Sequence, residues 1–532
     1  MTEMTAERKG FLAWVERTGN RLPDPVFIFF YLIAALIVIS VIAAWAGASA
    51  LHPTVIDEAT GAPLRLEAAS LLSAENIQRL WVDMPTTFTH FHPLGYVLVV
   101  MLGAGVAERS GLFGTAMRAA VADAPKFLLT PIVALTAMVG NLAADAAYVV
   151  LIPLAGVVFA AAGRHPVAGI AAAFAGVSGG FSANLVPGQL DALLFGITEA
   201  AVETVFAGWQ ANIAGNWYFI FAMTFVFLPV IWFVTDKIIE PRLGPWSPSA
   251  ATAVAAGETP DAPLEDESGP LTDDQVKGLK FAGLALLGVV ALWLAFTFGP
   301  GTPLIDETAT PEARLTPFYR SLVAGFFILF LACGWAYGRV AGTVKDHRDI
   351  VKMMSESMGD LAYYLVLAFA AAHFVAMFAW SNLGLIIAVH GADFLRGMAL
   401  PAPVLLAVIV LFTGLLNLFV GSASAKWALL APVLVPMLML LGISAETTTA
   451  AYRVGDSATN IITPLMVYFP LILIFCQRWT PDFGIGSLMA TMIPYSLWLL
   501  IGGVALIFAW VAIDIPMGPG APVFADLPTA AP

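Results

Sequence analysis

Apolar stretches of about twenty residues recur along this chain and constrain its fold more than any other feature. The first runs from Val26 to Ala46, and later ones include 217–234 and 488–513. About 20 apolar residues are enough for a helix to cross the hydrocarbon core of a bilayer. Of the 532 residues, 59% are hydrophobic and only 11% are charged, whereas soluble domains carry about 25% charged residues. The sequence therefore predicts an all-α polytopic membrane protein.

Basic residues indicate on which side of the membrane each stretch ends. Lysine and arginine accumulate in cytoplasmic loops, so Arg8 and Lys9 ahead of the first stretch predict a cytoplasmic N-terminus. Two apolar stretches, about 126–162 and about 401–441, have polar centres and enter and leave on one side. We interpret them as re-entrant helical hairpins, the first entering from inside and the second from outside. The whole pattern predicts about nine transmembrane helices.

The order of these segments occurs twice along the chain. Residues 1–243 and 277–513 each contain one hairpin followed by one polar interruption of an apolar stretch. Residues 244–276, rich in proline, alanine and acidic residues, predict a cytoplasmic linker between them, and 514–532 predict a periplasmic tail. Because the two hairpins have opposite orientations, we expect an inverted repeat.

The polar interruption of the second half lies between Thr449 and Pro470, TAAYRVGDSATNIITPLMVYFP. Asp456 at the centre of a spanning helix would cost about 2.5–3.5 kcal/mol, so this run lines a cavity or has a buried partner. A weaker copy, GVSGGFSANLVP, lies at 176–187. In inverted-repeat transporters such interruptions meet near the middle of the bilayer and bind substrate and ions.

Side-chain oxygens at the hairpin tips and interruptions are candidate ligands for a cation, since hard cations prefer oxygen. We interpret them as two related sites, one in each half, with substrate between the hairpin tips. For any single residue, hydrogen bonding between helices is an equal alternative. Asp191 and Asp145 are candidate proton carriers, although Asp191 equally suits a helix cap. The possible sodium ligands are Asn141, Ser182, Asn184, Ser422 and Asn460, and no other cofactor is indicated.

Arg453 is the most specific candidate for a substrate contact, because a guanidinium group can donate two parallel hydrogen bonds to a carboxylate. The alternative is a structural ion pair with Asp456 or Asp191. Trp427, at the tip of the second hairpin, suits stacking on an aryl substrate or ordinary packing. Its neighbour Lys426 is interpreted either as a further substrate contact or as a residue at the membrane surface.

In these motifs the chain resembles the p-aminobenzoyl-glutamate transporter (AbgT) family over nearly its whole length. The resemblance is carried by ERTGNRLPDPVFIFFYL, GNLAADAAYVVLIPLA, AGVSGGFSANLVPGQLDALLFG, GSASAKWALLAPVLVPML and AYRVGDSATNIITPLMVYFPL. It implies a homodimer in a bacterial inner membrane that carries out secondary transport of p-aminobenzoyl-glutamate or proton-driven export of sulfonamide antimetabolites. The direction and the coupling ion, proton or sodium, stay open. The family's functional positions match at Asp191, Ser424, Trp427, Arg453, Asp456 and Pro464.

Other classes of function explain fewer of these sequence features than an aryl-anion transporter does. An ion-coupled carrier of dicarboxylates or other carboxylates is the main alternative, and it predicts that Trp427→Ala is tolerated while Arg453→Ala is not. An intramembrane aspartyl protease is a further alternative, because VGD at 454–456 matches part of the motif of such enzymes. This chain, however, lacks the glycine that precedes VGD in that motif, and none of its apolar stretches supplies a Tyr-Asp partner. A passive channel would need no ion gradient. We therefore expect a transporter rather than an enzyme, with no Walker loop for ATP and no basic patch for nucleic acid.

Overall fold

The computed structural model describes residues 24–525 except 57–60, 123–124, 144–146, 207–208, 210–211, 247–270, 300, 309–313, 464–465 and 467. Asp145 and Pro464 therefore lie outside the described residues. Nearly every described element is a helix, as predicted. One antiparallel sheet joins β1 (Ser49–Ile56) to β2 (Pro63–Glu67). This sheet is not predicted from the sequence, because a short hairpin within a polar segment carries little periodic signal.

Long apolar helices account for most of the expected membrane crossings. One crossing consists of two helices, α5 (His92–Arg109) and α6 (Leu112–Ala122), with a bend of 64° between them. The bend lies at Gly111, whose φ of +87° favours glycine. Six helices of the described chain are long and apolar enough to cross alone: α2 (Pro25–Trp45), α11 (Trp217–Phe233) continued by η5 (Val234–Ile239) and α12 (Glu240–Leu243), α14 (Asp273–Phe298), α16 (Leu322–Ala341), α18 (Ala362–Trp380) and α24 (Ile485–Ile513).

Shorter helices stand where the hairpins and interruptions are predicted. The first hairpin region holds α7 (Leu129–Gly140) and α8 (Ile152–Ala161), and the second holds α20 (Ala402–Asn417) and α21 (Ala423–Met439). The interrupted segments are α9 (Pro166–Phe174), η4 (Ala175–Gly179) and α10 (Gln189–Glu203) in the first half, and α22 (Ala445–Asn460) and α23 (Phe469–Gln477) in the second. If each interrupted segment is one crossing, the described helices reach the nine crossings that the sequence predicts.

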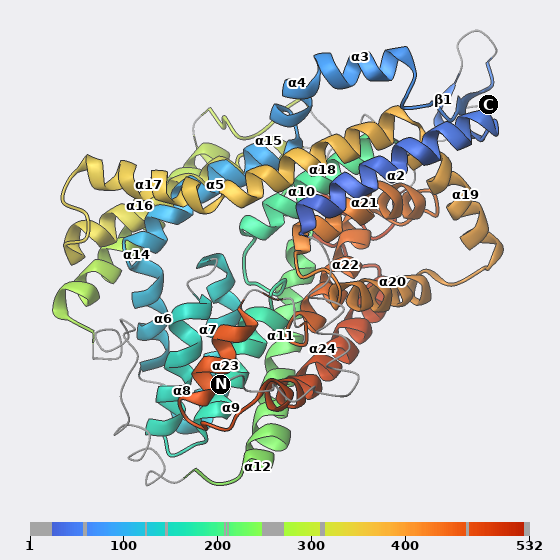
Figure 1. The fold of residues 1–532 in the computed structure, drawn as a ribbon. Helices are drawn as coiled ribbons and strands as arrows, with labels where there is room; N and C mark the ends of the chain where they lie inside the picture. Colours follow the sequence, from blue (N-terminus) through green and yellow to red (C-terminus); the bar gives the residue numbers. More distant parts are fainter. Residues whose placement is uncertain are drawn as a thin grey trace, which may run out of the picture.

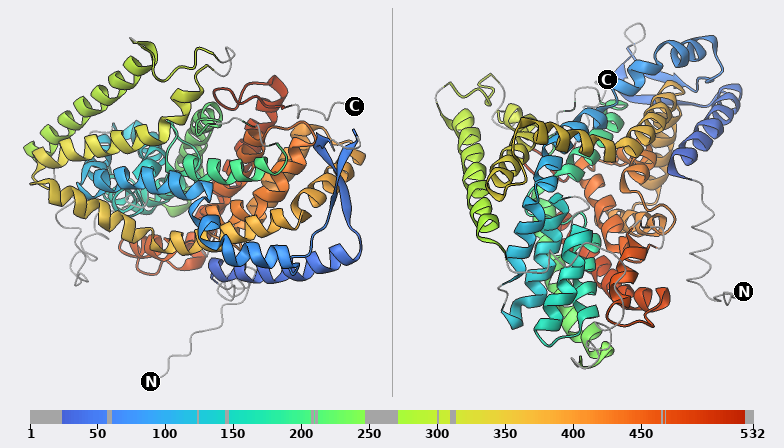
Figure 2. Two further views of the ribbon diagram at one scale, coloured as in Figure 1. Left: turned by 90° about the horizontal axis from the view of Figure 1, so that it is seen from above. Right: turned by 60° about the vertical axis from the view of Figure 1, so that its left-hand side comes forward.

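The two halves of the chain interleave rather than forming separate bodies. Figure 1 shows α23, from the second half, among α8 and α9 of the first, while α10 of the first half packs against α21 and α22. Figure 2 shows α14 at the outer edge, where it packs against α16. The remaining α-helices are α3 (Ala74–Val82), α4 (Met84–Thr89), α15 (Thr316–Arg320), α17 (His347–Asp360) and α19 (Leu383–Gly397), and the short helical segments η1 (Lys126–Leu128), η2 (Asn141–Ala143) and η3 (Ala147–Leu151) belong to the first hairpin region.

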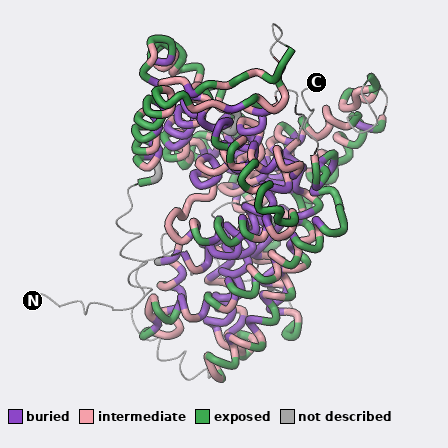
Figure 3. Tube along the Cα trace, turned by 90° about the vertical axis from the view of Figure 1, so that its right-hand side faces the viewer, coloured by how far each residue is buried: buried purple, intermediate pink, exposed green. Residues whose placement is uncertain are grey.

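Polar α22 lies inside the molecule, whereas apolar helices face outward. Every residue of α22 except Glu446 is buried, and Figure 3 shows that buried segments fill the centre of the trace. On the outer helices, large apolar side chains such as Tyr31 and Phe508 are exposed by 61% and 44%. This inside-out distribution suits a lipid environment, in which polar side chains face the interior of the helix bundle.

Candidate functional site

An ion pair at the centre of the molecule joins the two interrupted segments. Arg453 Nη1 of α22 donates to Asp191 Oδ1 of α10 at 2.7 Å, and the two side chains are 3% and 6% exposed. Asp191 Oδ2 also accepts from the backbone N–H of Gly188 at 2.7 Å, which caps the start of α10. The structure thus gives Asp191 both a capping and a charge-pairing role, and it pairs Arg453 with Asp191 rather than with Asp456.

A cavity of about 250 Å³ lies beside this ion pair. A smaller cavity of about 30 Å³ is also lined by Arg453 and Asp191, together with Glu446. Because the pair lines both cavities, any change in its geometry alters both. The polar lining of the larger cavity includes Asn141, Ser182, Asn184, Asp191, Tyr364 and Arg453, and its apolar lining includes Val97, Met101, Phe181 and Leu361.

Three polar residues of the first half, Asn141, Ser182 and Asn184, form what we call the neutral cluster. The Asn141 and Asn184 amide nitrogens both donate to the Met138 carbonyl oxygen, at 3.1 Å and 3.4 Å. The backbone N–H of Ser182 donates to Ser457 Oγ at 2.8 Å, which links the two interruptions directly. The Ser182 hydroxyl oxygen is itself buried and makes no hydrogen bond. The three residues predicted to bind a cation in this half therefore do lie together.

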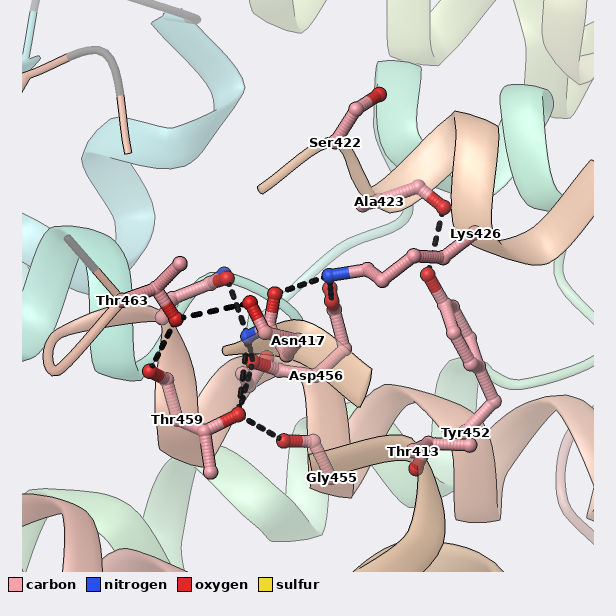
Figure 4. Close-up of polar contacts among 12 residues, drawn as sticks. Thr413, Asn417, Ser422, Ala423, Lys426, Tyr452, Gly455, Asp456, Thr459 and Thr463 are labelled. Carbon is pink, nitrogen blue, oxygen red and sulfur yellow. Dashed lines mark hydrogen bonds and ion pairs between the residues drawn. The ribbon is translucent and has the colours of Figure 1, made fainter. Parts of the chain in front are cut away.

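Four polar residues of the second half, Asn417, Lys426, Asp456 and Asn460, form what we call the charged cluster. Figure 4 shows Lys426 Nζ in contact with Asp456 Oδ1 and Asn417 Oδ1. Asn417 Nδ2 donates to the Asp456 carbonyl oxygen at 2.7 Å and to Asn460 Oδ1 at 2.8 Å. Lys426 is only 2% exposed, so its interpretation as a surface residue is wrong.

Asn417 connects Lys426 to α22, and it is not among the site residues predicted from the sequence. Its amide oxygen meets Lys426 and its amide nitrogen meets α22, so all its polar atoms are used within the buried interface. A signal was available, because Asn417 ends an apolar helix and is followed by leucine, as Asn141 is in the first half.

The aromatic candidate Trp427 is wholly buried in this conformation. Its ring stacks on Tyr452 with centroids 4.5 Å apart, and its Nε1 donates to Thr198 Oγ1 at 2.9 Å. In the first half, Tyr148 stacks similarly on Tyr468 at 4.3 Å. Stacking of Trp427 on an aryl substrate therefore stays a prediction.

The hydroxyl groups at the second hairpin tip have partners other than Asn460. Ser422 caps the start of α21, where its Oγ accepts from the Ala425 N–H at 3.3 Å. Its Oγ also lies 3.2 Å from Ser424 Oγ. Of the five predicted sodium ligands, Ser422 thus serves a helix cap and Asn460 bonds to Asn417. The described residues hold no group of three or more His, Cys, Asp or Glu able to bind a metal ion.

Comparisons with known proteins agree with this architecture. The model of the AbgT transporter family matches residues 10–525. The p-aminobenzoyl-glutamate transport protein of Escherichia coli (strain K12) is 34% identical over 507 residues, 95% of this chain and 96% of that protein. The crystal structure of the YdaH transporter of Alcanivorax borkumensis, described as having an unusual topology, matches with a TM-score of 0.83 and 41% identity, over 93% of this chain and 100% of that chain. MtrF of Neisseria gonorrhoeae, described as illuminating a class of antimetabolite efflux pumps, matches with a TM-score of 0.87 and 42% identity, over 96% and 100%.

Proposed function

Since this chain belongs to the AbgT transporter family, we propose that it is a secondary-active transporter of p-aminobenzoyl-glutamate and related aryl anions. The observation that carries the proposal is Arg453, a buried guanidinium group in the wall of a cavity of about 250 Å³. Its Nε makes no hydrogen bond, so the group retains donor capacity for a carboxylate. The named substrate of the Escherichia coli relative carries such carboxylates.

The ion pair offers a way to couple substrate to a proton. A substrate carboxylate that enters the cavity competes with Asp191 for the guanidinium of Arg453. A proton on Asp191 weakens its hold on Arg453, because the charge attraction is lost while the hydrogen bond to Gly188 can persist. Protonation of Asp191 and anion binding at Arg453 therefore favour each other, and such coupling is reciprocal.

Sodium is the other coupling ion that the geometry supports, and the neutral cluster is its candidate site. Asn141, Ser182 and Asn184 line the same cavity as Arg453. The Asn141 amide nitrogen now donates to the Met138 carbonyl oxygen. If this amide turned over, its oxygen and the Met138 carbonyl oxygen would both be available to a cation between them. The Ser182 hydroxyl, which makes no hydrogen bond, would add another oxygen ligand. A cation held there would offset the charge of a substrate anion nearby.

Direction, assembly and location complete the proposal. MtrF is described as belonging to a class of antimetabolite efflux pumps, so we extend the proposal to export of sulfonamides, which share the p-aminobenzoyl moiety. We also propose a homodimer in the bacterial inner membrane with a cytoplasmic N-terminus, acting as a carrier and not as an enzyme.

A carrier of dicarboxylates or other carboxylates is the second candidate. It is favoured by the burial of Trp427, whose ring packs on Tyr452 and does not line the cavity that holds Arg453. Under this alternative Trp427→Ala would leave uptake unchanged, whereas Arg453→Ala would abolish it.

The test is uptake of labelled p-aminobenzoyl-glutamate by proteoliposomes, with sodium and proton gradients imposed separately and in each direction. We expect uptake that follows one gradient and is lost in Arg453→Ala, with Arg339→Ala on the exposed end of α16 as the matched control. Folded protein that accumulates no substrate under any gradient would refute the aryl-glutamate proposal. Sulfonamides and dicarboxylates offered in the same assay would then identify the class of substrate.

A further inference from the structure

The charged cluster differs from an ordinary ion site because a lysine ammonium stands among its oxygens. Lys426 of α21 reaches Asn417 Oδ1 of α20 and Asp456 Oδ1 of α22, so three elements of the second half meet at one nitrogen atom (Figure 4). Lys426 and Asp456 are 2% and 1% exposed. Neither group can share its charge with bulk water, so each depends on the other.

The charges of this cluster cancel without any ion from solution. Asp456 supplies one negative charge and Lys426 one positive charge. Arg453, the neighbouring cation on α22, is engaged with Asp191 at 2.7 Å. A sodium ion on Asp456 would lie close to the Lys426 ammonium, and two positive charges repel strongly in a poorly solvated interior. Lys426 therefore disfavours a free cation at this position.

We propose that the Lys426 ammonium is a tethered cation that occupies a sodium-type site in the second half of the transporter. The oxygens of Asn417 and Asp456 that meet Lys426 Nζ would otherwise hold a free ion. This inference rests on the proposed ion-coupled transport, and it restricts exchange of a coupling ion to the cavity with the neutral cluster and Asp191. A short neutral side chain at position 426 leaves the same oxygens around a vacated volume, which sodium fills.

The test counts sodium ions on the purified full-length protein. Binding of ²²Na⁺ is measured for the wild type, Lys426→Ser and the double variant K426S/D456N, and thermal unfolding is followed in sodium or choline chloride at equal ionic strength. We expect Lys426→Ser to bind one more sodium ion per protomer than the wild type and to be stabilised more strongly by sodium. The double variant loses the carboxylate and should lose that extra ion.

A second comparison does not depend on the folding of Lys426→Ser. The double variant K426M/D456N replaces the ion pair by uncharged side chains of similar length, and its sodium count should equal that of the wild type. Loss of wild-type sodium binding in this variant would make Asp456 a sodium ligand and overturn the inference, as would an unchanged count in folded Lys426→Ser. Wild-type protein without gradient-driven uptake would refute the proposed function alone, because the sodium counts decide the inference separately.

Discussion

The neutral and charged clusters are built from the same parts in the two halves, yet they differ in charge and access. Each combines an asparagine at the end of a hairpin helix, Asn141 or Asn417, with an asparagine of an interrupted segment, Asn184 or Asn460. The sequence of that segment is Ser-Ala-Asn at 182–184 and Ser-Ala-Thr-Asn at 457–460. The neutral cluster lines the larger cavity, whereas the lining of that cavity includes no member of the charged cluster.

This difference indicates that the same structural arrangement has a different role in each half. In the first half, uncharged amides and a free hydroxyl face a cavity, so their partners can change during a transport cycle. In the second half, a buried ion pair and Asn417 hold α20, α21 and α22 together. Breaking a buried ion pair on one side costs much more than breaking neutral hydrogen bonds, so the second cluster is the fixed side of the site.

The largest expected effect is on stability and comes from breaking the ion pair of the charged cluster. Asp456→Asn leaves the Lys426 ammonium buried without a counter-charge, so we expect a loss of about 3–5 kcal/mol. Thermal unfolding of purified protein measures this loss. K426M/D456N removes both charges and should recover most of it. An equal loss in the single and double variants would show that the pair is not the source of stability.

Arg453→Ala tests the side of the comparison that faces the cavity. It removes the proposed carboxylate anchor and frees Asp191, so we expect uptake to fall by about a hundredfold, or about 2.7 kcal/mol. Arg453→Lys keeps the charge but not the fork geometry, and it should retain intermediate uptake. If Arg453→Ala and Asp456→Asn, corrected for folded protein, reduce uptake equally, the division into an active and a fixed side is wrong.

The sequence predicted the helical membrane fold and most of the residues at the centre. Apolar runs and polar interruptions located the helices, and charged residues in apolar surroundings identified Arg453 and Asp456, because such residues are costly unless they are used. The resemblance to the AbgT family added specificity, and the family match confirms it. The proposed ligand and coupling roles stay predictions.

The partners of these residues could not be predicted, because pairing depends on how distant helices interleave. Arg453 lies three positions from Asp456 but pairs with Asp191, 262 positions away in the chain. Lys426 is interpreted from the sequence either as a substrate contact or as a surface residue, and only the packing of α20 and α22 shows that it is buried. The role of Asn417 depends on its contacts with both Lys426 of α21 and Asp456 of α22, which the sequence alone does not show.

Close helix contacts allow a test of whether both halves are packed equally tightly. A Cβ on Gly455 would overlap the Val410 carbonyl oxygen and Thr413 Oγ1 of α20, and one on Gly176 would lie 2.8 Å from the Ala134 carbonyl oxygen of α7. We expect either glycine-to-alanine change to cost about 1–3 kcal/mol, measured by thermal unfolding. Gly486→Ala in α24 meets nothing within 4 Å and is the matched control. A cost for Gly455 alone would show that the first half yields more easily.

The smallest expected effect separates the two serines that join the interruptions. Ser457→Ala removes the acceptor of the buried Ser182 N–H, so we expect it to cost about 1–2 kcal/mol in thermal unfolding. Ser182→Ala removes a hydroxyl oxygen that makes no hydrogen bond, so its stability should change by at most about 0.5 kcal/mol. If that oxygen binds the coupling sodium, the sodium concentration for half-maximal uptake rises about tenfold, since a lost ligand costs about 1.4 kcal/mol. Unchanged sodium dependence in Ser182→Ala would leave the neutral cluster a packing contact and shift the coupling role to the proton on Asp191.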